Sequence, residues 1–467
     1  MKRLLSSLLV PPAVMLLVCS CVCKSQPDAA AAKPVAKPVA KPVTKPVTKP
    51  VAKSAAVVKA DKLTITPENG QHYRKVREVV KFNIQLAPGR KNVKFRAWIC
   101  GNKYINEASH PLTSDADGRA VLEIPAVEPG FIYVKVYDGK EEAAAGVAIE
   151  PEKIRPTRPA PADFDAYWDA VKARYDKTPV EFSRERIANA ARGFRAYQVH
   201  LLMGDPENLD AYGILTVPEN AAAGSLPVRL IVHGAGTDKV SPVYRHGCIV
   251  FSLNPMPVRN DGVNGDFIKK GRFQGYRSAN CDDRDKVFFN GMFQRVYRSL
   301  QFLKIQPEWD GKTVIISGTS QGGGQAIAGA GLDPDVTLCV AHVPALCSHA
   351  GRFDGAESGW PFFFQSGLYK KSPAKVLAAT AYVDAVNFAR RIKNAQVLFS
   401  TGFIDRACPS MTVYAAFNVI PSANKRIINN PLAMHRVPKE TRDEAERVIQ
   451  EHIKAMRQQS GKAKKAL

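Results

Sequence analysis

Thr313-Val-Ile-Ile-Ser-Gly-Thr-Ser320-Gln-Gly-Gly-Gly-Gln-Ala-Ile327 is the stretch of this chain that decides the fold. A short β-branched run predicts a strand, a Gly-x-Ser-x-Gly turn follows, and the next residues favour a helix. A strand, a strained turn and a helix form a nucleophile elbow, which lifts one serine hydroxyl out of a sheet. Ser320 would lie at a helix N-terminus, where backbone N–H groups can stabilise a developing negative charge. The stretch therefore predicts an acyl-transfer enzyme, most simply an ester hydrolase.

The same pentapeptide has other interpretations. It occurs by chance, and glycine-rich turns between a strand and a helix also serve as phosphate loops or as packing devices. A phosphate loop is disfavoured because no Gly-Lys-Ser or Gly-Lys-Thr follows the glycines. The hydrolase interpretation requires a general base for Ser320 and a carboxylate that orients the base. In α/β-hydrolases these two residues follow the serine in the order acid, then histidine.

Asp405 is the candidate acid. The residues Val397-Leu-Phe-Ser-Thr-Gly-Phe-Ile-Asp405 predict a strand that runs into a loop and ends on this aspartate. Active sites of open α/β sheets lie at the carboxyl ends of strands, so the position suits a catalytic carboxylate. The alternative is that Asp405 caps the helix expected after Pro409.

Two histidines, His435 and His452, follow Asp405 in the chain. His452 lies in a charged helical stretch, Glu444–Arg457, and is expected to face solvent. His435 lies in an irregular segment, Asn429-Asn-Pro-Leu-Ala-Met-His435, from which a side chain reaches a serine more readily. We therefore predict His435 as the general base.

Two backbone N–H groups are the candidate oxyanion donors. One belongs to Gln321, the residue after the nucleophile. The other belongs to Ala235 in Val232-His-Gly-Ala-Gly236, where a strand ends and glycines let the backbone approach a substrate. Each such donor stabilises the transition state by about 3–4 kcal/mol. His233 precedes the serine, and we expect it to pack and hydrogen-bond beneath this loop rather than act as the base.

Strand and helix signals alternate over residues 151–456, after a joint that is rich in proline. This alternation implies a mostly parallel sheet covered by helices on both faces. Together with the elbow, it predicts an α/β-hydrolase domain. The predicted strands are Tyr212–Val217, Val228–Val232, Cys248–Phe251, Thr313–Ser317, Thr337–Val343 and Gln396–Ser400.

A different pattern, with a period of two, occupies residues 60–150. Apolar and polar residues alternate over residues 80–86, and similar runs follow between turn clusters such as Asp115-Ala-Asp-Gly118. Short strands at this spacing predict a small all-β domain, a sandwich of immunoglobulin-like class. A spacer or docking role fits this domain better than glycan binding. A glycan-binding domain would need an aromatic platform, and no such platform can be recognised beyond Trp98 and Tyr133.

The N-terminus carries an export signal. Residues 1–21 contain two basic residues and an apolar run that ends before Cys21, as in a bacterial lipoprotein. We expect Cys21 to be lipidated and the protein to be held at the cell envelope, with cleavage and secretion as the alternative. Residues 22–59 include a Lys-Pro-Val repeat that should form an extended spacer. Residues 457–467 are predicted to form a basic tail.

The formal net charge is +23 for the 467 residues, which raises the question of nucleic-acid binding. Part of this charge lies in the signal, the repeat and the tail. We therefore expect attraction to an anionic envelope or an acidic polysaccharide, and no nucleic-acid partner. No Cys-x-x-Cys pair occurs, so a zinc site is not indicated. Cysteine spacing alone does not say which disulfides form in an exported protein.

Several distinct motifs occur in order over about residues 155–455. They are Pro161-Ala-Asp-Phe-Asp-Ala-Tyr-Trp168, Gly318-Thr-Ser-Gln-Gly-Gly323, Leu332-Asp-Pro334, His342-Val-Pro-Ala-Leu-Cys347, Tyr382-Val-Asp-Ala-Val-Asn-Phe-Ala389 and Asp405-Arg-Ala-Cys-Pro-Ser410. This set resembles the acetyl xylan esterase and cephalosporin-C deacetylase family, carbohydrate esterase family 7 in type.

The resemblance implies a Ser320–Asp405–His435 triad and removal of acetyl groups from carbohydrates such as xylan, without a metal or cofactor. The chain has Ala235 where the family usually has a tyrosine, which changes the wall of the acyl pocket. A homo-oligomer is left open. Two alternatives remain at this point: an esterase or peptidase of the same fold with another acyl substrate, and a non-catalytic glycan-binding lipoprotein.

Overall fold

The computed structural model describes residues 63–465, apart from residues 102, 205–208, 238, 261–272 and 365–371. The predicted signal, the Lys-Pro-Val repeat and the lipidation site Cys21 lie outside the described residues. No helix in the described part of the chain is both long and apolar enough to span a membrane.

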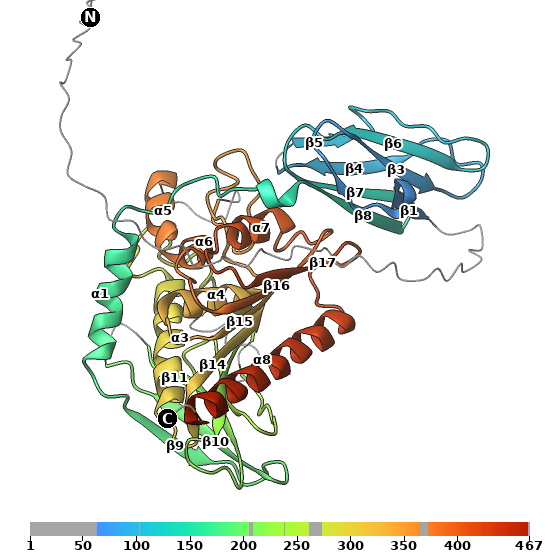
Figure 1. The fold of residues 1–467 in the computed structure, drawn as a ribbon. Coiled ribbons are helices and arrows are strands. Elements are labelled where there is room, and N and C mark those ends of the chain that lie inside the picture. The colour runs from blue at the N-terminus through green and yellow to red at the C-terminus, as the bar shows by residue number, and fades with distance from the viewer. Residues whose placement is uncertain are drawn as a thin grey trace, which may run out of the picture. The chain divides into compact units, whose positions relative to one another are not determined.

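A nine-stranded sheet has the strand order β17-β16-β15-β14-β12-β13-β11-β10-β9 (Figure 1). Its strands from β17 to β13 pair in parallel, and β11, β10 and β9 extend the sheet in antiparallel fashion. The predicted α/β-hydrolase sheet is therefore confirmed, and the elbow strand β14 lies in its parallel part. The bounds are β9 Phe182–Arg186, β10 Phe194–Leu201, β11 Ala211–Pro218, β12 Leu226–Val232, β13 Ile249–Leu253, β14 Trp309–Thr319, β15 Leu338–His342, β16 Gln396–Gly402 and β17 Lys425–Asn430.

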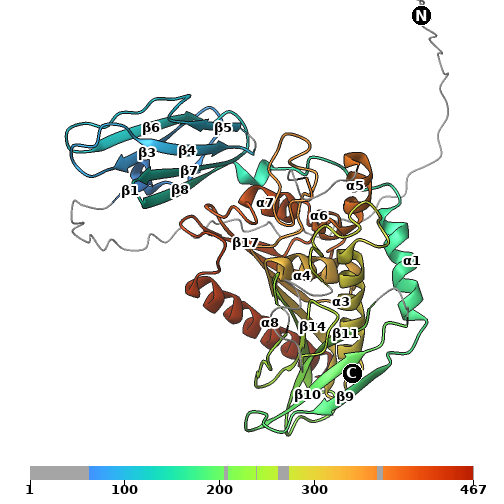
Figure 2. The ribbon, with the colours of Figure 1, turned by 180° about the vertical axis from the view of Figure 1, so that it is seen from behind.

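Helices cover both faces of this sheet, with α3 and α4 on one face and α8 on the other (Figures 1 and 2). Side chains on β14 alternate accordingly: Ile316 joins the core beneath α3 and α4, whereas Ile315 packs with Ile449 of α8. The predicted basic tail is helical as far as Lys465, because α8 continues through it. The helices are α1 Phe164–Asp176, α3 Phe288–Lys304, α4 Gln321–Leu332, α5 Pro373–Thr380, α6 Ala385–Ala389, α7 Ser410–Asn418 and α8 Lys439–Lys465, with the short 3-10 helix η3 at Ala381–Val383.

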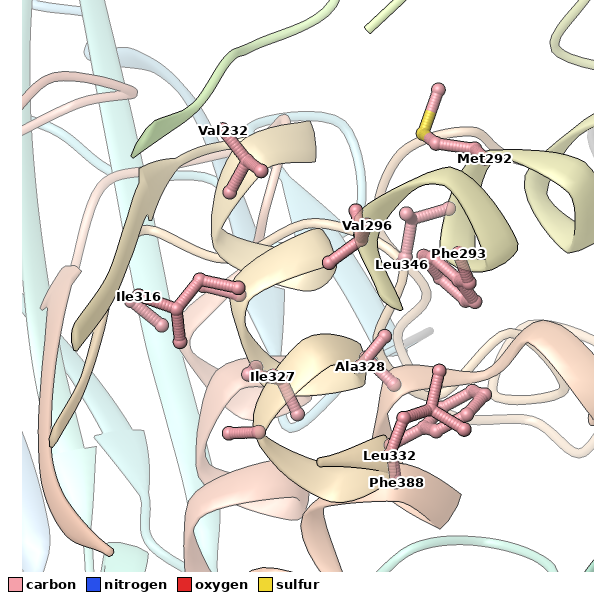
Figure 3. Packing of buried hydrophobic residues seen from close by; sticks show 14 of the residues in the cluster. Val232, Met292, Phe293, Val296, Ile316, Ile327, Ala328, Leu332, Leu346 and Phe388 are labelled. Atoms are coloured by element: carbon pink, nitrogen blue, oxygen red, sulfur yellow. The ribbon is translucent and has the colours of Figure 1, made fainter. Parts of the chain in front are cut away.

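The helix after the elbow is buried along its whole length. Figure 3 shows Ile327 of α4 lying among side chains of β14 and α3, including Ile316 and Val296. A Cβ at Gly329 would lie 2.5 Å from Cδ1 of Ile316 and 2.8 Å from Cγ1 of Val296, so any larger residue would force these side chains to shift. Because interiors packed to this density resist displacement, α4 holds the elbow in a fixed position.

The N-terminal part of the described chain forms two facing sheets, with strand orders β1-β3-β6 and β2-β8-β7-β4-β5. Their apolar side chains share one core, in which Phe82 of β3 joins Phe95 of β4 and Val134 of β7. Phe82 is buried and its neighbour Lys81 is not, as the period of two predicts. The bounds are β1 Thr64–Pro67, η1 Glu68–Gly70, β2 Tyr73–Arg74, β3 Val79–Gln85, β4 Lys94–Ile99, β5 Lys103–Asn106, β6 Arg119–Pro125, β7 Gly130–Asp138, β8 Glu141–Ile149 and η2 Pro151–Lys153.

A loop of the α/β domain contacts this β domain on both sides of Asp405. The Phe403 ring lies 5.0 Å from the Phe131 ring of β7. A Cβ at Gly146 of β8 would lie 2.7 Å from Cβ of Phe403, so glycine is required there. The Arg406 guanidinium lies 4.6 Å from the centre of the Trp98 ring. Trp98 therefore makes an internal contact, in agreement with a docking role for the β domain.

Candidate active site

Ser320 adopts the strained backbone expected of a nucleophile elbow. It lies between β14 and α4 with φ 60° and ψ −122°. A non-glycine residue in such a conformation costs about 1–3 kcal/mol, so the surroundings must stabilise it. Two backbone hydrogen bonds do so: the Ser320 N–H donates to the His342 carbonyl at 2.9 Å, and the Ser320 carbonyl accepts from the Ala345 N–H at 2.9 Å.

Steric contacts explain why glycine flanks Ser320 on both sides of the motif. A Cβ at Gly318 would lie 2.3 Å from the Gly322 carbonyl oxygen, and a Cβ at Gly322 would lie 2.3 Å from the Val232 carbonyl oxygen. Neither position accepts a side chain, because the obstructing atoms are backbone. The turn therefore closes tightly against the end of β12, which brings the loop after that strand next to Ser320.

The structure brings the three predicted residues of the relay together. His435 Nε2 lies 2.9 Å from Ser320 Oγ, and His435 Nδ1 lies 2.8 Å from Asp405 Oδ2. The Asp405 side chain is completely buried, whereas the His435 side chain is 33% exposed. Asp405 Oδ1 accepts hydrogen bonds from the N–H groups of Ala407 at 2.8 Å and Cys408 at 2.9 Å. Both carboxylate oxygens thus have partners, and one of them is aimed at the imidazole.

These residues come from the carboxyl ends of neighbouring parallel strands. Ser320 follows β14, Asp405 follows β16, and His435 lies after β17 and before α8. Chain order and strand position therefore agree with the sequence prediction. The predicted alternative role of Asp405, capping α7, is not observed, because its side chain bonds to the turn before that helix and to His435.

The two predicted oxyanion donors lie on either side of the nucleophile. Gln321 is the first residue of α4. A Cβ at Gly234 would lie 3.8 Å from Ser320 Cβ, which places the loop that contains Ala235 beside the serine. Among the described residues, neither the Gln321 N–H nor the Ala235 N–H donates a hydrogen bond. Both amides are therefore available to a substrate oxygen.

Comparison with known proteins identifies the family. The model of the acetyl xylan esterase (AXE1) family matches residues 149–450. This chain belongs to the acetyl xylan esterase family. The acetyl esterase Axe7A of Xylanibacter ruminicola is 33% identical over 339 residues, which cover 70% of this chain and 75% of that protein. Membership in the acetyl xylan esterase family makes the chain a carboxylic ester hydrolase.

Solved acetyl xylan esterases share the fold. The enzyme from Paenibacillus sp. R4 superposes with a TM-score of 0.56 at 23% identity, over 64% of this chain and 98% of that one. Acetyl xylan esterase 1 from Thermoanaerobacterium sp. gives a TM-score of 0.55 at 23% identity, over 65% of this chain and 98% of that one. The α/β-hydrolase fold predicted from the elbow is thus found in solved members of the acetyl xylan esterase group.

Tyr276 is a site residue of this acetyl xylan esterase family member that sequence patterns did not reveal. Its hydroxyl donates to Gln321 Oε1 at 2.9 Å. The backbone amide of Gly236 also hydrogen-bonds the phenol and lowers its pKa, but burial has the larger effect and raises the pKa to about 12. Tyr276 therefore joins the two segments that contain the candidate oxyanion donors. No local signal points to it, because Gln321 lies 45 residues further along the chain.

Aromatic rings cluster around Tyr276, and a thiol lies next to Ser320. The Tyr276 ring lies 4.9 Å from Phe288 and 6.3 Å from Trp360. The Cys408 side chain is within hydrogen-bonding reach of Ser320, and burial raises the pKa of its thiol well above the ordinary value. A neutral thiol is a weak nucleophile, so Cys408 acts as a small apolar surface rather than as a competitor of Ser320. The described cysteines, which are Cys100, Cys248, Cys281, Cys339, Cys347 and Cys408, are all buried and free.

The other histidines near the sheet serve packing. His233 Nε2 lies 2.8 Å from Ser252 Oγ, and burial lowers the His233 pKa to about 4, so the prediction that it packs beneath the loop is confirmed. The prediction that His452 faces solvent is wrong. Its ring nitrogens lie 2.9 Å from Gln396 Oε1 and 2.9 Å from Thr337 Oγ1, because it projects from the buried face of α8. Within the described residues, no group of three or more His, Cys, Asp or Glu side chains is placed to share a metal ion.

Proposed function

We propose that this protein is a serine esterase that removes acetyl groups from carbohydrate esters, with Ser320 as the nucleophile, His435 as the general base and Asp405 as the orienting acid. The observation that supports this most is the row of two hydrogen bonds from Asp405 through His435 to Ser320, at 2.8 Å and 2.9 Å. Membership in the acetyl xylan esterase family supports an acetylated sugar as the substrate.

The reaction follows from this geometry. Ser320 Oγ attacks the acetyl carbonyl carbon while His435 Nε2 takes the hydroxyl proton. Asp405 keeps the proton on Nδ1, so Nε2 is free to accept. The N–H groups of Gln321 and Ala235 stabilise the oxyanion. His435 then gives the proton to the departing sugar oxygen, and a water molecule activated in the same way releases acetate from the acetyl-serine.

The side chains on the segments next to Ser320 favour a small acyl group. Cys408 lies within hydrogen-bonding reach of Ser320. The Tyr276 hydroxyl bonds to Gln321, the residue after Ser320, and the Trp360 ring lies 6.3 Å from the Tyr276 ring. Trp360 is held in place by backbone hydrogen bonds to Ala407 at 2.7 Å and to Leu346 at 3.1 Å. Because buried surroundings of this kind do not yield easily, an acyl chain longer than acetyl would require rearrangement.

Acyl-length profiling tests this proposal. We expect kcat/KM for p-nitrophenyl acetate to exceed that for p-nitrophenyl butyrate by at least about tenfold, since two additional methylenes must be accommodated. Acetylated xylo-oligosaccharides should release acetate with the same purified protein. A preference for butyrate, or no acetate release from any acetylated oligosaccharide, would contradict the assignment as a carbohydrate deacetylase.

Tyr276→Phe should impair the transition state more than substrate binding. The change removes the hydroxyl that orients Gln321 and leaves the buried Gln321 carboxamide without a partner for Oε1, which costs about 1–3 kcal/mol. We therefore expect kcat for p-nitrophenyl acetate to fall by about tenfold or more, with KM nearly unchanged. Steady-state kinetics measures this.

Tyr297→Phe is the matched control. Its hydroxyl also donates to a partner in a buried setting, Asp176 Oδ1 at 2.5 Å, but that contact joins α3 to α1 and does not involve Gln321. This variant should melt at a lower temperature than the wild type and keep its kcat. Equal effects of both variants on kcat would show that Tyr276 has no special part in catalysis.

A further inference from the structure

Two arginines on α3, one turn apart, differ sharply in their partners. Arg295 and Arg298 are both 3% exposed. The Arg298 guanidinium donates to Gln301 Oε1 at 2.9 Å and to the carbonyl oxygens of Tyr175 and Thr178 at 3.3 Å each. Within the described residues, two atoms of the other guanidinium, Arg295 Nε and Nη2, have no hydrogen-bond partner, whereas Arg298 lacks one only at Nε. The Arg295 guanidinium is placed instead over the Phe288 ring, 5.5 Å from the ring centre.

An unpaired buried guanidinium lowers the stability of the folded state. Taking a charged group out of water costs several kcal/mol unless an opposite charge or hydrogen bonds compensate, so buried charges in proteins are normally paired. Burial lowers the pKa of Arg295 to about 10, and no carboxylate of the described residues offsets this effect. Arginine still keeps its proton at neutral pH. The fold therefore retains a positive charge whose counter-charge is not among the described residues.

Arg295 lies on a cavity that can admit such a counter-charge. The cavity measures about 500 Å³ and is lined by residues of α1, of the N-terminal half of α3 and of residues 280–287. Arg174 and Lys286 add two further positive charges to its lining. Asp285 is the acid among the described lining residues, and its Oδ1 accepts a hydrogen bond from the Tyr167 hydroxyl at 2.8 Å. The lining is therefore positive on balance.

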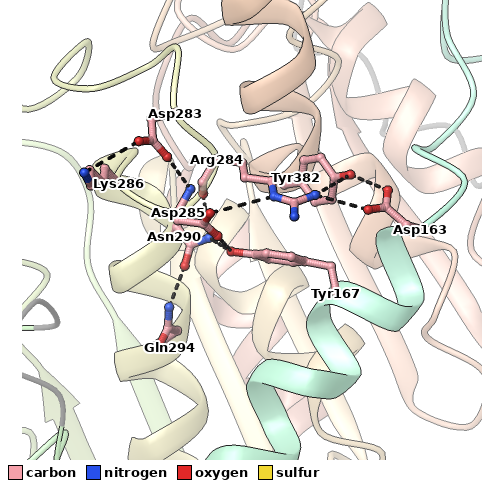
Figure 4. Close-up of polar contacts among 9 residues, drawn as sticks. All are labelled: Asp163, Tyr167, Asp283, Arg284, Asp285, Lys286, Asn290, Gln294 and Tyr382. Carbon is pink, nitrogen blue, oxygen red and sulfur yellow. Dashed lines mark hydrogen bonds and ion pairs between the residues drawn. The ribbon is translucent and has the colours of Figure 1, made fainter.

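The rim of this cavity is held in place by polar contacts. Figure 4 shows Tyr167 of α1 reaching toward Asp285 and Asn290, and Gln294 bonding to Asn290. Gln294 in turn accepts from Arg174 Nη2 at 2.8 Å, which orients that guanidinium. Because these contacts fix α1 against α3, the cationic groups are preorganised, and less entropy is lost when a ligand binds.

We propose that this cavity binds an acidic sugar, a hexuronic acid residue, through its carboxylate. A guanidinium matches a carboxylate with two parallel hydrogen bonds. The amide of Asn280 is suited to sugar hydroxyls, and Val171 and Phe288 add apolar surface to the lining. The volume of the cavity admits one pyranose unit with its substituents.

This site goes beyond the proposed esterase activity and does not depend on it. The cavity is nevertheless close to the candidate active site, because Phe288 lines it and also contacts the Tyr276 ring edge-on, and the Tyr276 hydroxyl bonds to Gln321. An acidic sugar on the same polymer as an acetylated sugar would therefore bind near the reacting group. The positive charge of the chain favours such a polymer as well.

Thermal melting in the presence of D-glucuronate tests the proposal. Saturating D-glucuronate should raise the melting temperature of the wild type by ~2 °C or more, whereas D-glucose, and sodium chloride at equal ionic strength, should not. In Arg295→Met the shift should disappear, and the variant should melt at or above the wild-type temperature because an unpaired buried charge has been removed. Ser320→Ala should keep the full shift, which separates this binding from the esterase activity.

Arg298→Met is the matched control on the same helix. It should lower the melting temperature, because it removes a guanidinium that has partners, and it should keep the glucuronate shift. Lys286→Met leaves the core intact and should raise the half-saturating glucuronate concentration several-fold. A shift retained in Arg295→Met, an unchanged midpoint in Lys286→Met, or an equal shift with D-glucose would each overturn the proposal. Sodium sulfate acting at concentrations as low as glucuronate would overturn the assignment of a sugar acid.

Discussion

Replacing Ser320 by alanine is expected to lower kcat for p-nitrophenyl acetate by about 10⁶-fold, the scale seen when the nucleophile of a serine hydrolase is removed. The change deletes the one atom, Oγ, that lies 2.9 Å from His435 Nε2 and forms the acyl-enzyme. Alanine keeps the backbone at φ 60° under the same strain as serine, so the fold should be unaffected. Single-turnover and steady-state assays with p-nitrophenyl acetate measure the loss.

Ser317→Ala is the matched control for this experiment. Ser317 is a buried residue of β14, the strand that leads into Ser320, and its Oγ accepts from Arg229 Nε at 3.0 Å. It should keep most of the wild-type kcat. Fluorophosphonate labelling should modify the wild type and Ser317→Ala, but not Ser320→Ala. Equal rates for the wild type and Ser320→Ala would falsify the assignment of the nucleophile.

Asp405→Asn is expected to lower kcat by about 10⁴-fold while leaving the fold intact. Asparagine can keep the two hydrogen bonds that Asp405 Oδ1 accepts from Ala407 and Cys408, because its amide oxygen takes the same place. Its NH₂ group then faces His435 Nδ1 and donates to it. The imidazole proton is forced onto Nε2, which can no longer accept the proton of Ser320.

The Asp405 prediction has an internal control in the pair His200 and Asp210. His200 Nε2 lies 2.7 Å from Asp210 Oδ2, which gives a second histidine–aspartate pair elsewhere in the domain, with both side chains partly exposed. Asp210→Asn should leave kcat within about twofold of the wild type. If Asp405→Asn also stayed within tenfold, Asp405 would have no part in the relay. Circular dichroism and melting curves should show both variants folded.

The three candidate residues could be selected from the sequence because each has a local signal in addition to its chain order. Ser320 is marked by glycines that no other residue can replace, and Asp405 by the apolar strand before it. Chain order left His435 and His452, and the irregular segment around His435 favoured it over His452. The charged neighbours of His452 suggest an exposed position, whereas the helical period places it on the buried face. His452 lies three residues after Ile449 and four after Val448, on the buried face of α8.

Strands that are exposed or poor in β-branched residues could not be predicted from the residue pattern. The edge strand β9 has exposed residues throughout and contains Arg184, Glu185 and Arg186, so it has no apolar alternation. β8 is rich in alanine, which gives a weak strand signal, although its C-terminal half is buried. Tyr276 and Arg295 had no signal of any kind, because their importance arises from partners that are present or absent in three dimensions.

The contacts of Phe403 and Arg406 couple the β domain to the candidate acid. Asp405 lies between two residues that the β domain holds, one against Phe131 and Gly146 and the other against Trp98. A side chain at Gly146 would meet the backbone of Phe403, two residues before Asp405. A mutation in the β domain can therefore disturb the candidate active site without touching any of its residues.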